Sequence, residues 1–131
     1  MTKDDLKKRF KDFALRIIRL VDSMPNTISS QALAKQIIRS GTSPFSNYRS
    51  ACIAKSDKDF LNKLKMVEEE LDETAGWLEL ISESEIISKD RLVLIQNECN
   101  ELLKIITASI VTCRNKLNCI GKDSISKNSK W

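Results

Sequence analysis

The sequence predicts an all-α protein, an antiparallel up-down four-helix bundle whose second helix is kinked near Pro44. Apolar residues recur at spacings of three and four through most of the 131 residues, which is the period of amphipathic helices. Only three Gly, two Pro and 5% aromatic residues are present, whereas sandwiches and barrels need many turn-forming and strand-forming residues. Short links between the predicted helices favour antiparallel packing.

The first helix is predicted over residues 4–24, where lysines and arginines separate the apolar positions. Those positions are Leu6, Phe10, Phe13, Ala14, Ile17, Ile18, Val21 and Met24. Pro25 and Asn26 are expected to end this helix, because proline cannot continue a helical hydrogen-bond ladder.

The second helix is predicted to begin at a cap formed by Ser29 or Ser30 and to end at about Ala54. Pro44 lies inside it, where proline removes one backbone donor and clashes with the preceding turn. The sequence therefore predicts either a kink between Ser40 and Pro44 or a helix broken into two.

The third helix is predicted to begin after Ser56, which forms a capping-box pattern with Asp59, and to end in the polar run 82–84. Ser88 can cap a fourth helix that ends at about Leu117. No apolar stripe continues beyond Cys119. The expected organisation is thus one bundle over residues 1–118 and a flexible tail over residues 119–131.

The four cysteines are Cys52, Cys99, Cys113 and Cys119, and no two of them form a CxxC pair. Cys99 and Cys113 are two heptads apart on the apolar face of the fourth helix, so reduced core thiols are favoured over disulfides or reactive thiols. Trp77 is expected to be mostly buried, with its indole N–H hydrogen-bonded.

Catalysis is not expected. The absence of histidine excludes His-based triads and HExxH zinc sites, and no phosphate-binding glycine loop occurs. Four clustered acids, Glu69, Glu70, Asp72 and Glu73, lack the histidines that a di-iron bundle requires, so they are interpreted as structural or pairing residues. The sequence predicts no catalytic residue, no cofactor and no metal site.

The chain begins MTKDDLKKRF, which lacks the apolar core of a secretory signal, and no window holds 18 uncharged apolar residues. A cytoplasmic protein with no membrane span is therefore expected.

Charge is unevenly distributed. Residues 23–56 contain four cations and no acid, whereas residues 57–85 contain ten acids and three lysines. The favoured interpretation is pairing between neighbouring helices or subunits, and the alternative is a phosphate-binding surface. The candidate nucleic-acid-binding residues are Arg39, Arg49 and Lys55 in the second helix and Lys7, Lys8 and Lys11 in the first.

The second helix also carries a stripe of small residues beside its apolar face. The stripe comprises Ser40, Ser43, Asn47, Ala51 and Ala54, which are candidates for an oligomer interface. An equally acceptable interpretation is a tight crossing within the bundle, around the kink at Pro44.

Several segments together resemble a known family. They are RSGTS at 39–43, NYR at 47–49, the acids at 69–73 and WLEL at 77–80. The chain resembles, over about residues 8–117, the bacterial four-helix-bundle family that includes proteins encoded in intervening sequences of large-subunit ribosomal RNA genes. That resemblance implies a ring, typically a homopentamer, without known catalysis. The accessory variability protein of diversity-generating retroelements is structurally similar, and it binds nucleic acid and a reverse transcriptase.

Four residues depart from the family pattern. Ser50 replaces the usual glutamate, Ile53 a common arginine, Pro44 an aliphatic residue and Gly76 a larger residue. Gly76 is expected to weaken the third helix by about 1 kcal/mol relative to alanine, or to make room for a bulky neighbour.

Two functions follow from the sequence and the resemblance. The first is a non-enzymatic homo-oligomer, most simply a pentamer, that associates with RNA or DNA. The alternative is a scaffold with a protein partner, in which the charges serve only subunit pairing.

Overall fold

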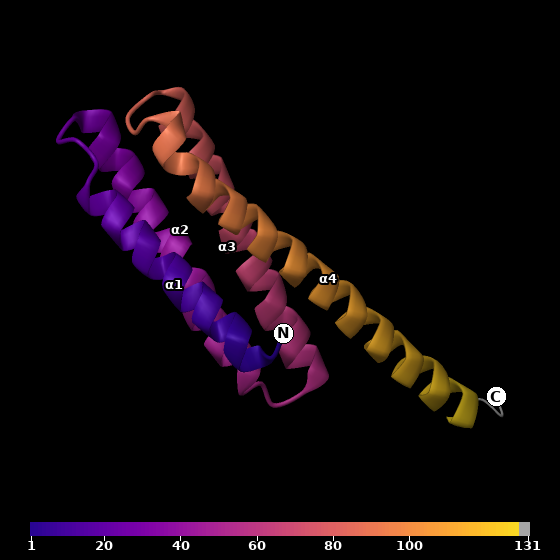
Figure 1. Ribbon diagram of the computed structural model, residues 1–131. Coiled ribbons are helices and arrows are strands. Elements are labelled where there is room, and N and C mark those ends of the chain that lie inside the picture. Colours follow the sequence, from indigo (N-terminus) through magenta and orange to yellow (C-terminus); the bar gives the residue numbers. More distant parts are fainter. Residues whose placement is uncertain (129–131) are drawn as a thin grey trace.

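The protein is a bundle of four helices in a computed structural model that describes the backbone of residues 1–128 and the side chains of residues 1–119. The helices, in order, are α1 (Lys3–Asp22), α2 (Ile28–Cys52), α3 (Asp57–Glu83) and α4 (Lys89–Asn128). The links at 23–27, 53–56 and 84–88 are short, and each reverses the chain (Figure 1). The described residues contain no strand, which confirms the predicted all-α bundle.

Polar side chains cap the first and third helices. Thr2 Oγ1 accepts a hydrogen bond from the Asp5 amide at 3.1 Å, and the Asp5 carboxylate accepts one from the Thr2 amide at 2.9 Å. The pKa of Asp5 lies below its ordinary value, because hydrogen bonding to its carboxylate by the Thr2 amide, and then by the Thr2 hydroxyl, favours the charged form. Ser56 caps α3 by accepting from the Asp59 amide at 3.0 Å, as predicted.

The cap of α2 differs from the prediction. Thr27, not Ser29 or Ser30, accepts from the Ser30 amide at 3.3 Å. Thr27 has the extended backbone of a cap residue, with φ −109° and ψ 163°, whereas Ser30 is fully buried in the first turn. The prediction lies two to three residues too late, because Thr27, Ser29 and Ser30 all carry a hydroxyl that can cap a helix.

Pro44 lies within one continuous helix, so the prediction of a broken second helix is wrong. A proline inside a helix costs about 3 kcal/mol, and tertiary contacts must offset this cost. Pro44 is itself buried, and neighbouring residues of α2 pack against helices on both sides. The kink at Pro44 stays a prediction.

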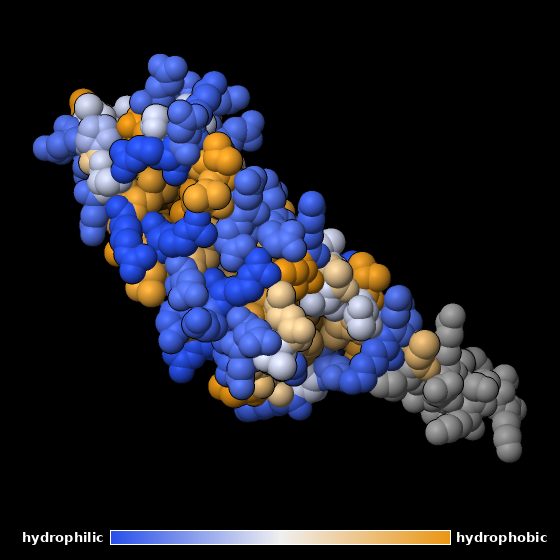
Figure 2. Space-filling model, viewed as in Figure 1, coloured by the Kyte–Doolittle hydropathy of each residue, from blue (hydrophilic) through white to orange (hydrophobic). Residues whose placement is uncertain are grey.

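Each helix packs against the one that follows it in the chain, and the contact between α2 and α3 is the most extensive. Contact between α1 and α4 is the sparsest, and apolar side chains reach the surface between these two helices (Figures 1 and 2). The largest fully buried side chains come from all four helices: Phe10, Phe13, Ile17, Ile37, Leu64, Val67, Leu71, Leu78, Ile81, Leu92, Leu102 and Ile106. One core therefore holds the bundle together, although its α1–α4 side is only loosely closed.

Helix α4 is much longer than its neighbours and projects past the end of the bundle (Figure 1). Lys116 Nζ lies 3.4 Å from the Asp57 carboxylate at the start of α3, so the part of α4 after Lys116 extends beyond α3. The predicted end near Leu117 is wrong, because loss of an apolar stripe ends packing but does not end helical backbone. The boundary at residue 118 and the mobility of the tail stay predictions, and residues 129–131 lie outside the described part.

The thiols differ in environment. Cys99 is fully buried, donates to the Leu71 carbonyl at 3.4 Å, and has its pKa raised by burial to about 12. Cys113 is also buried, as predicted, whereas Cys52 is half-buried and Cys119 is exposed. The prediction of core thiols is thus wrong for Cys119, which lies beyond the end of α3. All four thiols are free.

Gly41 of α2 and Gly76 of α3 have opposite surroundings. A Cβ atom at Gly41 would lie 2.7 Å from Ile17 Cγ1, whereas nothing lies within 4 Å of a Cβ atom at Gly76. Among the described residues, Gly76 therefore makes room for no neighbour. The close approach of α1 and α2 at Gly41 leaves no space for a side chain.

Opposite stability effects are expected for the two Gly→Ala substitutions. Gly76→Ala should raise the free energy of unfolding by up to about 1 kcal/mol, because alanine is the better helix former. Gly41→Ala should lower it by about 1–3 kcal/mol through overpacking against Ile17. Urea denaturation of both variants at one protein concentration measures the difference. Stabilisation by both substitutions would contradict the close α1–α2 contact.

Candidate interaction surfaces

The small-residue stripe of α2 lies only partly inside the bundle. Ser40 and Ala51 are buried, with 0% and 1% of their surfaces exposed, so their assignment to an oligomer interface is wrong. Thr74 Oγ1 lies 2.9 Å from Ser40 Oγ and 2.7 Å from the Glu70 carbonyl oxygen. The stripe lets α2 and α3 approach closely, which confirms the alternative of a crossing within the bundle at this point.

Three residues of the stripe are half-buried. Asn47 Nδ2 donates to Ser43 Oγ at 3.0 Å along the edge of α2, and Ala54 lies beside the end of the helix. Their place in an oligomer interface stays a prediction.

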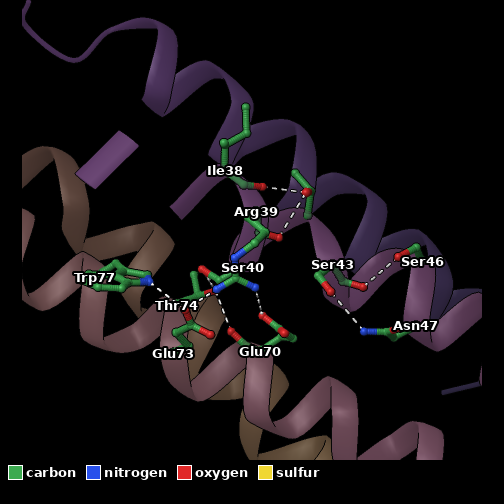
Figure 3. A network of polar contacts seen from close by, with 11 residues as sticks. Ile38, Arg39, Ser40, Ser43, Ser46, Asn47, Glu70, Glu73, Thr74 and Trp77 are labelled. Carbon is green, nitrogen blue, oxygen red and sulfur yellow. Dashed lines mark hydrogen bonds and ion pairs between the residues drawn. The ribbon is translucent and has the colours of Figure 1, made fainter. Parts of the chain in front are cut away.

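Arg39 is held by carboxylates of α3 (Figure 3). Its guanidinium contacts Glu70 Oε2 at 3.0 Å and also donates to Glu73 Oε1. Trp77 Nε1 donates to the same Glu73 oxygen at 3.3 Å, so the predicted indole partner is confirmed. The Trp77 ring is half-buried rather than mostly buried, because it lies one position away from the core stripe of Leu78.

This network reduces the value of Arg39 as a phosphate ligand. Two carboxylates already surround its positive charge, and a phosphate would have to displace them or accept their repulsion. The predicted pairing between the second and third helices is therefore observed at Arg39, within one chain. Because half of the Arg39 side chain is exposed, each pair contributes at most about 1 kcal/mol.

The cations of α1 fall into paired and unpaired groups. Lys7 Nζ lies 3.0 Å from Asp4, and Arg9 forms a two-pronged contact with Glu98 of α4 at 3.2 and 2.5 Å. That contact raises the pKa of Arg9, because the carboxylate favours the charged form. Lys8 and Lys11 are exposed and have no carboxylate within ion-pair distance among the side chains of residues 1–119.

A basic and apolar surface follows the outer contact of α1 and α2, and we call it the α1–α2 seam. It comprises Lys7, Lys11 and Ile18 of α1 and Ile38, Thr42, Phe45 and Arg49 of α2. Within each helix these residues are three, four or seven positions apart, so they lie on one side of it. Lys7, Phe45 and Arg49 line one shallow pocket, so the two flanks meet.

Arg49 and Phe45 give the seam its character. The Arg49 guanidinium lies 5.6 Å from the centre of the Phe45 ring, and no carboxylate of the described side chains pairs with it. Ile18 and Ile38 are 38% and 37% exposed. The sequence pattern places Ile18 in the apolar stripe of the first helix, whereas the structure exposes it, and the spacing of Phe45 and Arg49 is that of neighbours on one helix face.

The outer face of α3 has the opposite charge. Its exposed carboxylates are Glu69, Asp72, Glu79 and Glu83, none of which is in an ion pair with a described side chain. Lys55, the last of the predicted cations, is exposed after the end of α2 and lines a large pocket at that end of the bundle. The structure thus places the six candidate cations in three separate regions.

The helical bundle, the polar network between α2 and α3 and the charged helix faces together define a small all-α protein of the four-helix-bundle class. The chain belongs to the 23S rRNA-intervening sequence protein family, whose model matches residues 3–108. A solved structure of a protein with unknown function from the S23 ribosomal protein family of Bacteroides thetaiotaomicron VPI-5482 is similar, with 36% identity and a TM-score of 0.78. The match covers 84% of this chain and 98% of that one. No functionally curated protein matches the chain.

Within the described residues, no helix combines the length and apolar character needed to cross a membrane. The same part of the chain contains no group of three or more histidine, cysteine or acidic side chains arranged to hold a metal ion.

The Ser40–Thr74 pair should behave as a unit. Thr74→Val should lower the free energy of unfolding by about 1–3 kcal/mol, because it leaves the buried Ser40 hydroxyl without a partner. Adding Ser40→Ala should recover part of this loss, since no unpaired hydroxyl then remains. Denaturant unfolding of the two single variants and the double variant measures the coupling. Strictly additive effects would show that the two hydroxyls are independent.

Proposed function

We propose that the protein is a non-enzymatic, oligomeric binding protein that associates with nucleic acid through the α1–α2 seam. The observation that carries this proposal is that four of the six candidate cations, Lys8, Lys11, Arg49 and Lys55, are exposed and have no carboxylate partner among the described side chains. Lys11 and Arg49 lie in the seam itself, and Lys8 lies on the adjacent outer face of α1. Such side chains can contact phosphates without first breaking an ion pair.

Arg49 supports a contact to single-stranded nucleic acid in particular. Its guanidinium stacks near the Phe45 ring, and a half-exposed aromatic ring beside a cation offers a base a surface for stacking.

Assembly is part of the proposal because the charge of one chain is small. A net charge of +4 gives weak attraction to phosphate, whereas several copies in one particle multiply the number of contacts. The ring that the family resemblance implies would present several seams at once.

The alternative is a scaffold whose charges serve subunit pairing, and the exposed acids of α3 favour it. The basic seam of one copy and the acidic α3 face of another are complementary, and such unlike surfaces generate rings or filaments. The ion pairs described above do not support it, because Arg39 and Arg9 pair with acids of their own chain.

The native mass should be a multiple of 14.9 kDa, with a pentamer as the leading expectation. Light scattering at micromolar concentration measures this mass, and a monomer would contradict assembly.

Ser46→Trp places a large ring on the exposed side of α2 beside Ser43 and Asn47, and it should reduce the mass if this side contacts another copy. Far-UV circular dichroism checks that the bundle itself survives.

Binding to a labelled 20-nucleotide RNA should weaken as salt increases, with a slope of about 0.7 per phosphate contact in a plot of log affinity against log salt. The Lys11→Gln, Arg49→Gln double variant should weaken binding for every sequence tested and flatten this slope. Fluorescence anisotropy between about 50 and 300 mM KCl measures both effects.

Arg39→Gln is the matched control, because it also removes one arginine from α2 but one that Glu70 and Glu73 already pair with. It should lower stability more than it lowers RNA affinity. No binding to RNA or duplex DNA at 50 mM KCl, together with an intact assembly, would reject the nucleic-acid function and leave the scaffold. Equal losses of affinity in the control and in the double variant would reject the seam as the binding surface.

A further inference from the structure

A pocket of about 930 Å³ lies at the end of the bundle where α2 is linked to α3. Its walls come from the beginning of α1, from the last turn of α2, the link after it and the first turn of α3, and from α4 between Ile105 and Lys116. The pocket forms here because α1 has little contact with α4, so the side chains of α4 face a gap that α1 does not fill. Its volume lies in the upper part of the range for small-molecule sites, about 300–1,000 Å³.

The interior of the pocket is apolar. Leu6, Tyr48, Ala51, Phe60 and Ile105 line it, and the first three are buried with at most 5% of their surface exposed. The Tyr48 ring is fixed by Phe10, whose centroid lies 5.1 Å away. Burial raises the pKa of the Tyr48 hydroxyl, so this group stays protonated and keeps a hydrogen to donate. These walls suit an apolar body of aromatic or aliphatic carbon.

The rim of the pocket is basic. Lys3, Lys55 and Lys116 line it with one acid, Asp57, which leaves three positive charges against one negative charge. Asp57 pairs with Lys116 at 3.4 Å. Lys3 Nζ lies 4.7 Å from the centre of the Phe60 ring, and neither Lys3 nor Lys55 has a carboxylate partner for its ammonium group among the described side chains. An anion at the rim would meet two ammonium groups that are not neutralised.

We propose that this pocket binds a small amphipathic anion, with an apolar carbon body between Phe60 and Ile105 and one acidic group between Lys3 and Lys55. The apolar walls and the excess positive charge at the rim are complementary to the two parts of such a molecule. This site does not rest on the proposed nucleic-acid function, since it needs neither the seam nor assembly, although Lys55 is also one of the candidate nucleic-acid-binding cations.

Two dyes that share one apolar body test the proposal. 8-Anilinonaphthalene-1-sulfonate carries an acidic group, and N-phenyl-1-naphthylamine is the same body without it. The sulfonate should bind once per chain, with increased and blue-shifted fluorescence and at least tenfold higher affinity than the neutral dye. Lys3→Gln with Lys55→Gln should weaken sulfonate binding about three- to tenfold and leave the neutral dye unchanged. Equal affinities for the two dyes, or no saturation at one dye per chain, would overturn the proposal.

Ala108→Trp tests the location of the site. Ala108 is an exposed residue of α4 that lines the pocket, so the indole can fill the pocket without entering the core. Ala32→Trp is the control, because Ala32 is an exposed alanine of α2 that does not line the pocket. Ala108→Trp should reduce dye affinity at least tenfold and Ala32→Trp should not, with thermal unfolding confirming that both variants fold. Unchanged binding in folded Ala108→Trp, or equal loss in both, would reject this pocket as the site.

Discussion

The structure depends on the packing of α2 between α1 and α3. On one side Gly41 allows the backbone of α2 to approach Ile17, and on the other the hydroxyls of Ser40 and Thr74 meet in a buried contact. Ser40 and Gly41 are adjacent in α2 but contact different helices, α3 and α1. A substitution at either residue that shifts α2 therefore alters both contacts. This double constraint explains why α2 accommodates Pro44 without breaking, and it leaves only a narrow side of α2 exposed.

The position of each cation around α2 determines what it can do. Arg39 lies on the flank towards α3, where Glu70 and Glu73 surround it, whereas Arg49 lies on the flank towards α1, where Phe45 is its neighbour. Both residues belong to a stretch without a single acid in the sequence. Their different environments follow from rotation around one helix, and only the packed bundle shows which flank meets the acids.

Much of the fold follows from the sequence, because helical periodicity and caps are local properties. The core positions from Phe10 to Ile106 repeat at helical spacing, and Ser56 signals the start of α3 directly. The cap of α2 is less well determined by the sequence, because Thr27 and Ser30 are close together and both carry a hydroxyl that can cap a helix. The small stripe of α2 could not be assigned from the sequence, because small residues suit a crossing within a bundle and a contact between subunits equally well. The end pocket could not be predicted either, since it arises from sparse contact between α1 and α4, helices that are far apart in the chain.

The contact between Arg9 and Glu98 has a consequence for how the bundle opens. It joins α1 to α4 on the side where apolar packing is weakest, so part of the closure of this side is carried by charge. Charge attraction near a surface is screened by dissolved ions, whereas apolar packing between the other helices is not. Rising ionic strength should therefore loosen the contact between α1 and α4, and the amide hydrogens of α1 should gain more in exchange rate than those of α2 and α3 as salt increases. The contact between α1 and α4 is thus the side of the bundle that is most sensitive to the surrounding salt.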